Sequence, residues 1–172
     1  MSLSLLETTG PAWRIREGSV EDAEEMWRLD RRCFSPRTAY PLPIFEDLLE
    51  TESIFSFVAE TVGQAHGIAG FVIAEIEEGD TRLGHVITLD VSQEARRTGL
   101  GSEFLNRAYQ RMVEAGANFC LLEVDVRNEG AIAFYRRHGF IVMELLKNYY
   151  GQRRNGYLMI KELNGASSGH QQ

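Results

Sequence analysis

The sequence has few of the features that several classes of protein require. It contains only two cysteines, Cys33 and Cys120, which cannot build a disulfide framework and form no CxxC pair for zinc. Its four histidines show no HExxH spacing, so we predict no metal site. No apolar run approaches the length that crosses a bilayer, and the first ten residues lack the pattern of a signal peptide. We therefore expect a cytoplasmic protein without membrane association, with both cysteines reduced in its core.

Positive charge is also scarce. The 172 residues include 18 Lys and Arg against 25 Asp and Glu, which gives a net charge of −7. A nucleic-acid binder needs a basic surface to displace counterions, so we expect no nucleic-acid partner. An acidic surface is compatible with an amine-bearing substrate. The oligomeric state is left open, and we expect a monomer or a homodimer.

The pattern of apolar residues predicts antiparallel strands first, followed by strands that alternate with helices. We expect strands at Trp13–Arg16, Ser53–Glu60, Ile68–Glu77, Gly84–Val91, Phe119–Val126, Phe140–Leu146 and Gly156–Leu163. Helices are expected after Ser19, at Ile44–Glu50, from Gly101 to about Ala115, and at Ala131–Arg137. This order predicts an α/β (α+β) fold with a single mixed, mostly antiparallel central sheet and helices on both faces. We expect residues 13–163 to form one domain, with a flexible segment at 1–12 and a disordered tail at 164–172.

A turn that suits a phosphate follows the strand ending at Val91. Its residues, Arg96-Arg97-Thr98-Gly99-Leu100-Gly101, open a helix. Glycines let backbone N–H groups face a ligand closely, and a helix N-terminus adds unsatisfied donors and partial positive charge. There is no GxxxxGK[ST] P-loop, and the third glycine of a dinucleotide fingerprint is absent. A pyrophosphate is therefore the expected ligand, although on its own a helix start with solvated arginines explains the turn equally well.

This turn resembles the coenzyme A motif of the GCN5-related N-acetyltransferases (GNAT), whose pattern is [Q/R]-x-x-G-x-[G/A]. A second block, Leu122-Glu123-Val124 to Asn128-x-x-Ala131-x-x-Phe134-Tyr135 and Gly139-Phe140, is similar to RimI-type and archaeal protein N-terminal acetyltransferases. The resemblance covers about residues 13–163. It implies a GNAT-like fold and an enzyme that moves an acetyl group from acetyl-CoA to a primary amine. The N-terminal α-amine of a protein, for example a ribosomal protein, is the leading acceptor; the alternatives are a small-molecule amine or a non-catalytic acyl-CoA-binding module.

The resemblance also implies which residues bind the coenzyme. Backbone amides from Arg97 to Ser102 would bind the pyrophosphate, and Leu89 and Val91 would pair with the pantetheine arm as an added strand does. Asn128 would hydrogen-bond that arm. The full implied set is Leu89, Asp90, Val91, Arg96, Arg97, Thr98, Gly99, Leu100, Gly101, Ser102, Asn128, Ala131 and Tyr135.

Three residues are candidates for the chemistry. An α-amine has a reference pKa near ~8 and is largely protonated at neutral pH, so a general base is needed. Glu123 is the first candidate, because a carboxylate in an otherwise apolar strand is costly unless it is paired or used. Tyr135 would donate a proton to the departing thiolate, and His85 matches a histidine of the archaeal and eukaryotic relatives. Structural roles remain the alternatives: a bonded glutamate, a tyrosine packed beside Phe134, and a lone strand histidine.

The acceptor region is implied by the same resemblance. In the relatives the peptide lies between the segment that corresponds here to Cys33–Phe45 and the hairpin at Tyr149–Gly156. Tyr149 and Tyr150 could flank the peptide backbone or pack as edge aromatics. The acidic stretch usual in the relatives is replaced by Arg153-Arg154, which could favour an acidic residue along the peptide or the coenzyme phosphates. We interpret Arg136-Arg137-His138 as a solvated helix end.

Overall fold

The computed structural model describes residues 12–34, 39–63, 67–79 and 82–163. The flexible N-terminus and the disordered tail expected from the sequence fall almost wholly on residues 1–11 and 164–172, outside the described residues. No helix of the described ranges is long and apolar enough to cross a membrane.

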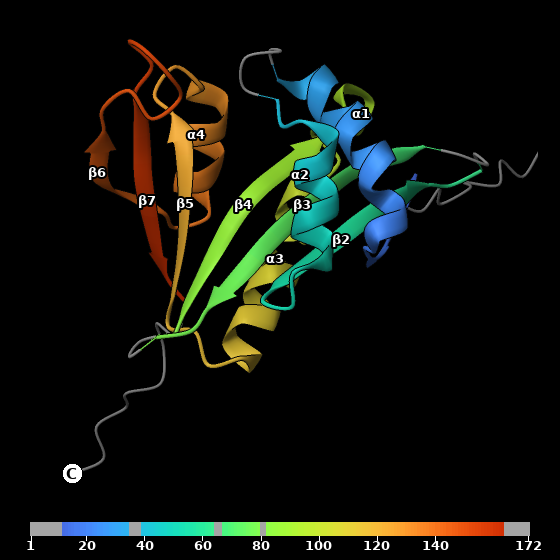
Figure 1. Ribbon diagram of the computed structural model, residues 1–172, viewed down its shortest axis with the longest axis horizontal. Helices are drawn as coiled ribbons and strands as arrows, with labels where there is room; N and C mark the ends of the chain where they lie inside the picture. The colour runs from blue at the N-terminus through green and yellow to red at the C-terminus, as the bar shows by residue number, and fades with distance from the viewer. Residues whose placement is uncertain (1–11, 35–38, 64–66, 80–81, 164–172) are drawn as a thin grey trace, which may run out of the picture.

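The described strands form one mixed sheet in the order β1-β2-β3-β4-β5-β7-β6 (Figure 1). Only β4 and β5 run parallel, because every other neighbouring pair is antiparallel. The mixed, mostly antiparallel sheet is therefore confirmed. The strands are β1 (Trp13–Glu17), β2 (Ile54–Thr61), β3 (Ile68–Glu77), β4 (Leu83–Val91), β5 (Phe119–Asp125), β6 (Ile141–Leu146) and β7 (Gly156–Glu162).

Helices cover both faces of the sheet, as expected. The elements are η1 (Val20–Asp22), α1 (Ala23–Cys33), α2 (Leu42–Glu50), η2 (Gln93–Ala95), α3 (Leu100–Glu114) and α4 (Glu129–Arg137). The α1 and α2 helices pack on Phe71 and Ile73 of β3, whereas α3 and α4 share a second buried cluster with Val72 and Ala74 of the same strand. Because side chains alternate between the two faces of β3, this one strand contributes to both hydrophobic cores.

The α4 helix begins two residues before the expected start. Asn128 is its N-cap, and the Asn128 side-chain oxygen accepts a hydrogen bond from the Ala131 amide at 3.1 Å. Glu129 lies in the first turn, where a negative charge is favourable. The Asn128 amide donates to the carbonyl of Asp125, the last residue of β5, at 2.9 Å, so α4 starts close to the end of that strand.

The parallel strands β4 and β5 separate along their length. Their pairing runs only from Leu83 to Val86 on β4, opposite Phe119 to Leu122 on β5. Beyond this point the two strands diverge, as Figure 1 shows. The gap lies at the C-terminal ends of two parallel strands, a common place for a ligand.

A bulge in β4 changes which side chains face each layer of helices. Val86 pairs with Ala74 and Thr88 pairs with Ile73, so Ile87 is an extra residue on β4. After the bulge, the buried side chain of Asp90 lies on the α1 side, where the charge of Asp30 acts on it, while Leu89 packs against the α3 cluster. Simple alternation from His85 would have predicted the opposite faces.

Candidate active site

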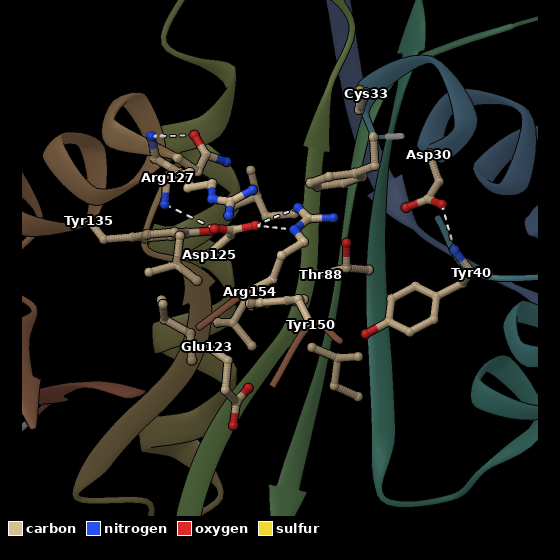
Figure 2. A pocket seen from close by; sticks show the side chains of 18 residues that line it. Asp30, Cys33, Tyr40, Thr88, Glu123, Asp125, Arg127, Tyr135, Tyr150 and Arg154 are labelled. Atoms are coloured by element: carbon tan, nitrogen blue, oxygen red, sulfur yellow. Dashed lines mark hydrogen bonds and ion pairs between the residues drawn. The ribbon is translucent and has the colours of Figure 1, made fainter. Parts of the chain in front are cut away.

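A cavity of about 420 Å³ opens where β4 and β5 separate. Figure 2 shows Glu123, Asp125 and Tyr135 along one wall and Asp30 and Tyr40 along the other. The cavity brings together six of the residues expected at the site, which are Leu89, Glu123, Asn128, Ala131, Tyr135 and Tyr150. Tyr149 is not among the lining residues; its half-exposed ring packs edge-on against Tyr150, with 5.0 Å between the ring centroids.

Glu123 is paired with His85. The Glu123 Oε2 atom lies 2.7 Å from His85 Nε2, and the other ring nitrogen of His85 lies 3.6 Å from Glu77 Oε1. Burial of the ring opposes its protonation, but the hydrogen bond from Glu123 and the charges of Glu123, Glu77 and Glu75 outweigh burial and raise the pKa of His85. Glu123 and His85 therefore form a hydrogen-bonded pair between neighbouring strands, and Glu123 lines the cavity.

Tyr135 lies in the last turn of α4, and its side chain lines the cavity. It is 9% exposed and packs edge-on against Phe134 and Phe140. Burial, followed by the charge of Asp90, raises the pKa of Tyr135 well above that of a free phenol. The hydroxyl therefore keeps its proton throughout the neutral range, as a proton donor requires.

The glycine turn has the backbone geometry expected of a phosphate site. Gly99, the N-cap of α3, adopts φ 88°, and Arg97 adopts φ 62°. No side chain caps the first turn of α3, and a Cβ built on Gly99 would meet nothing within 4 Å. The first amides of α3 are thus left to bind an anion. These features fit the pyrophosphate of coenzyme A.

Three hydrogen bonds that were not expected from the sequence hold this turn in place. The Trp13 indole N–H donates to Thr98 Oγ1 at 3.0 Å, and Thr98 Oγ1 in turn donates to the Ala95 carbonyl at 2.7 Å. His138 Nε2 lies 3.0 Å from Ser102 Oγ. The interpretation of His138 as part of a solvated helix end was therefore wrong, because its half-buried ring links the end of α4 to the start of α3.

The segment between β6 and β7 is fastened to the end of β5. The Arg154 guanidinium pairs with Asp125 Oδ2, through Nε at 3.1 Å and through a closer Nη2 contact (Figure 2). Burial alone would raise the pKa of Asp125, but the Arg127 amide and the Arg154 guanidinium outweigh it and lower that pKa. Arg127 also donates to the Arg153 carbonyl at 3.0 Å. Arg154 is therefore not a free cation for an acidic peptide, and its pairing positions Tyr150 at the cavity.

The cavity also contains residues that the sequence analysis did not name individually as site residues, although two of them, Cys33 and Tyr40, belong to the Cys33–Phe45 segment expected beside the peptide. Cys33, expected in the core, is half-buried and lines the cavity, and its thiol contacts the Val91 carbonyl at 3.6 Å. Burial and the charge of Asp90 raise the pKa of Cys33 to about 11, so the thiol is protonated at neutral pH. Asp30 and Tyr40 also line the cavity. Only Cys120 is a core cysteine.

Asp90, expected among the coenzyme-binding residues, has a buried side chain that faces α1 rather than the coenzyme side. Any contact of Asp90 with the coenzyme would therefore be through its main chain.

The absence of a metal stays a prediction. Among the described residues, ligand atoms of Glu75, Glu77 and His85 lie within 4.8 Å of one another, but His85 is already bonded to Glu123.

Comparisons with known proteins agree with this geometry. Residues 23–140 match the acetyltransferase (GNAT) family. An N-alpha-acetyltransferase of Sulfurisphaera tokodaii is 32% identical over 165 residues, covering 90% of this chain and 95% of that protein. The structure of Ard1 from Thermoplasma volcanium aligns with a TM-score of 0.76 at 27% identity, over 88% of this chain and 97% of Ard1.

The fold is shared more widely. The ribosomal-protein-S18-alanine N-acetyltransferase from Escherichia coli aligns with a TM-score of 0.76 at 20% identity, over 93% of this chain and 99% of that one. The resemblance inferred from the Gly99 turn and the Asn128–Tyr135 block is thus confirmed. The chain belongs to the acetyltransferase (GNAT) family and is an acetyl-CoA-dependent N-acetyltransferase.

Proposed function

We propose that this enzyme acetylates the N-terminal α-amine of proteins. The observation that carries the proposal is the pairing of Glu123 with His85 in the wall of a cavity that Tyr135 also lines. The archaeal N-alpha-acetyltransferase relative, aligned over almost its whole length, supports this acceptor class. Cytoplasmic location and the monomeric or dimeric state stay predictions.

Acetyl-CoA, when bound, supplies the acetyl group as a thioester. The uncapped amides at the start of α3 would hold its pyrophosphate, next to Arg96 and Arg97. Leu89 would pair with the pantetheine arm through its main chain, because β4 has no strand partner on the β5 side after Val86. Val91 is a weaker candidate, since its carbonyl already accepts from Cys33 and Arg96.

Glu123 would act as the general base. The α-amine must lose a proton before it can attack, and Glu123 accepts this proton directly or through one water. His85 fixes the orientation of the Glu123 carboxylate through the 2.7 Å contact. Asn128 would contact the coenzyme arm, although its side-chain oxygen is already used to cap α4.

Tyr135 would supply the proton that the departing thiolate needs. Its phenol is buried at the cavity and stays protonated, and it lies on α4, beside the gap that would hold the coenzyme arm. Tyr150 also lines the cavity and would contact the acceptor peptide. Tyr149 would lie at the outer edge of the same surface.

The acceptor class can be tested with a free-thiol assay. The purified chain is given acetyl-CoA and either peptides with varied first residues or small amines such as polyamines and amino acids. We expect turnover with peptides and none after their α-amine is blocked. Turnover with a small amine alone would identify a small-molecule acetyltransferase. Coenzyme binding without turnover of either acceptor would indicate a non-catalytic acyl-CoA-binding module.

A further inference from the structure

Two carboxyl groups meet in the interior between α1 and β4. Asp30 and Asp90 are each 1% exposed, and they lie close enough together for each carboxyl group to shift the pKa of the other. Asp30 also lines the cavity (Figure 2). Asp90 reaches this position only because the bulge at Ile87 turns it toward α1. Two adjacent buried carboxylates would repel each other strongly, so the pair needs a physical explanation.

Within the described part of the chain, the hydrogen bonds to the pair leave two carboxyl oxygens without a donor, and one proton can satisfy both. The Tyr40 amide donates to Asp30 Oδ2 at 2.9 Å, and the Thr88 hydroxyl donates to Asp90 Oδ1 at 3.0 Å. The other two oxygens, Asp30 Oδ1 and Asp90 Oδ2, are buried without a hydrogen-bond donor among the described residues. Ionised carboxylates only accept hydrogen bonds, so a proton held between these two oxygens satisfies both.

The surrounding charges favour the same state. Burial first, and then the charge of Asp30, raises the pKa of Asp90 well above its usual value, and burial raises the pKa of Asp30 to about 6. The charge of Arg96 lowers the pKa of Asp90 but only partly offsets burial. Besides burial, the charges of the pair raise the pKa values of three neighbouring groups, which are Cys33, Tyr40 and Tyr135. All three are uncharged at neutral pH.

We propose that Asp30 and Asp90 share one proton and thereby position the acceptor side of the active site. The pair joins α1 and Tyr40, at one wall of the cavity, to the part of β4 that would hold the coenzyme. The positioning role rests on the proposed function, whereas the shared proton does not. Loss of the proton leaves two negative charges in contact, which pushes α1 and Tyr40 away from β4. Acceptor binding weakens as a result, while the Glu123 and Tyr135 chemistry is retained.

Asparagine substitutions test the shared proton directly. In Asp90→Asn the new amide donates to Asp30 Oδ1 while its oxygen still accepts from Thr88; in Asp30→Asn the corresponding bonds to Asp90 Oδ2 and Tyr40 form. Each single variant therefore replaces the titratable proton with a permanent donor. The double variant Asp30→Asn/Asp90→Asn brings two NH₂ groups together, and one hydrogen bond is lost.

Initial rates are measured on the full chain with a peptide acceptor from about pH 5 to about pH 9. We expect the wild-type KM for the peptide to rise at alkaline pH with little change in kcat, and each single variant to remove that rise. The double variant should raise the KM at all pH values by about tenfold, the effect of one lost buried hydrogen bond. Asp47→Asn, at an exposed aspartate of α2, should behave as wild type.

Thermal unfolding of the same variants separates the outcomes. The raised pKa values mean that the native chain holds a proton that the unfolded chain releases above about pH 4. Wild-type Tm should therefore fall relative to Asp90→Asn as pH rises. Single variants that keep the wild-type profiles of KM and Tm, or a double variant no worse than the singles, would overturn the proposal. Absence of peptide turnover by wild type would instead refute the proposed function, and the Tm profiles would still test the shared proton.

Discussion

His85 Nε2 lies 2.7 Å from Glu123 Oε2, and this contact joins β4 to β5 where their pairing ends. His85 is two residues before the Ile87 bulge, and Glu123 is the first residue of β5 beyond the paired segment. Carboxylates approach both nitrogens of the His85 ring, which explains why its pKa is raised despite burial. A base at this position has a fixed orientation and still faces the cavity.

The change Glu123→Gln tests the general base. The amide keeps the shape and a hydrogen bond to His85 but cannot accept the proton of an ammonium group. We expect kcat to fall by about 100-fold or more while the Kd for acetyl-CoA stays within about twofold. Steady-state kinetics and calorimetry measure the two quantities. Glu77→Gln changes the more exposed carboxylate beside His85 and is the control; equal losses in both variants would argue against Glu123 as the base.

The change Tyr135→Phe tests the proton donor. The ring still fills the space beside Phe134 and Phe140, so the fold and coenzyme affinity should be kept. We expect kcat to fall by about 10- to 100-fold because the thiolate leaves without a positioned proton. Tyr109→Phe, which removes another buried phenol hydroxyl from α3, controls for general effects of burial. Unchanged turnover in Tyr135→Phe would remove this residue from the mechanism.

The His85–Glu123 pair should make stability depend on pH. A folded-state pKa above the unfolded value of about 6.5 means that the pair stabilises the fold fully below that pH. The stabilisation is lost as pH rises through the raised pKa of His85. The Tm difference between wild type and His85→Gln should therefore be largest in mild acid and shrink toward alkaline pH. A difference that stays constant with pH would show that His85 contributes through packing alone.

The pairing of Asp125 with Arg154 should control acceptor binding. Arg154→Ala releases the segment that carries Tyr150, so we expect the KM for a peptide to rise several-fold with a smaller change in kcat. Both side chains are largely buried, and a double-mutant cycle with Asp125→Asn should give a coupling of about 1–2 kcal/mol. Arg153→Ala removes the same charge from the neighbouring exposed position and should change neither quantity much. An equal rise in KM for both arginine variants would indicate a general charge effect.

The sequence predicted well those features that depend on local pattern. The seven strands, the Gly99 turn and the unusual position of Glu123 all follow from residues close together in the chain. The bulge at Ile87 was missed because an extra residue in a strand leaves the apolar pattern almost unchanged. As a result the sequence could not show that Asp90 faces α1.

Contacts between distant residues were also missed. The Asp30–Asp90 pair and the His138–Ser102 contact join residues that are 60 and 36 positions apart, and no local spacing encodes them. One signal was available, because a charged residue such as Asp90 in an otherwise apolar strand calls for a partner. The same reasoning that singled out Glu123 could have singled out Asp90 as a paired side chain.

The change Gly99→Ala tests the phosphate turn, and Gly63→Ala is a matched control. Gly99 and Gly63 adopt φ 88° and 81°, and at both positions a Cβ would meet nothing within 4 Å. Each substitution should therefore cost only backbone strain, about 1–2 kcal/mol, with similar losses of Tm. Gly99 caps the helix whose amides would bind the pyrophosphate, whereas Gly63 follows β2.

We therefore expect Gly99→Ala to raise the Kd for acetyl-CoA by about tenfold, the equivalent of about 1.4 kcal/mol, because the strained turn relaxes and its amides move away from the ligand. Gly63→Ala should lower Tm by a similar amount and leave that Kd unchanged. Calorimetric titration of both variants with coenzyme A and with its dephosphorylated pantetheine portion completes the test, since a turn that binds the pyrophosphate affects only the first ligand. Equal effects on the two ligands would place the pyrophosphate elsewhere, and the left-handed conformation of Gly99 would then serve the fold rather than the coenzyme.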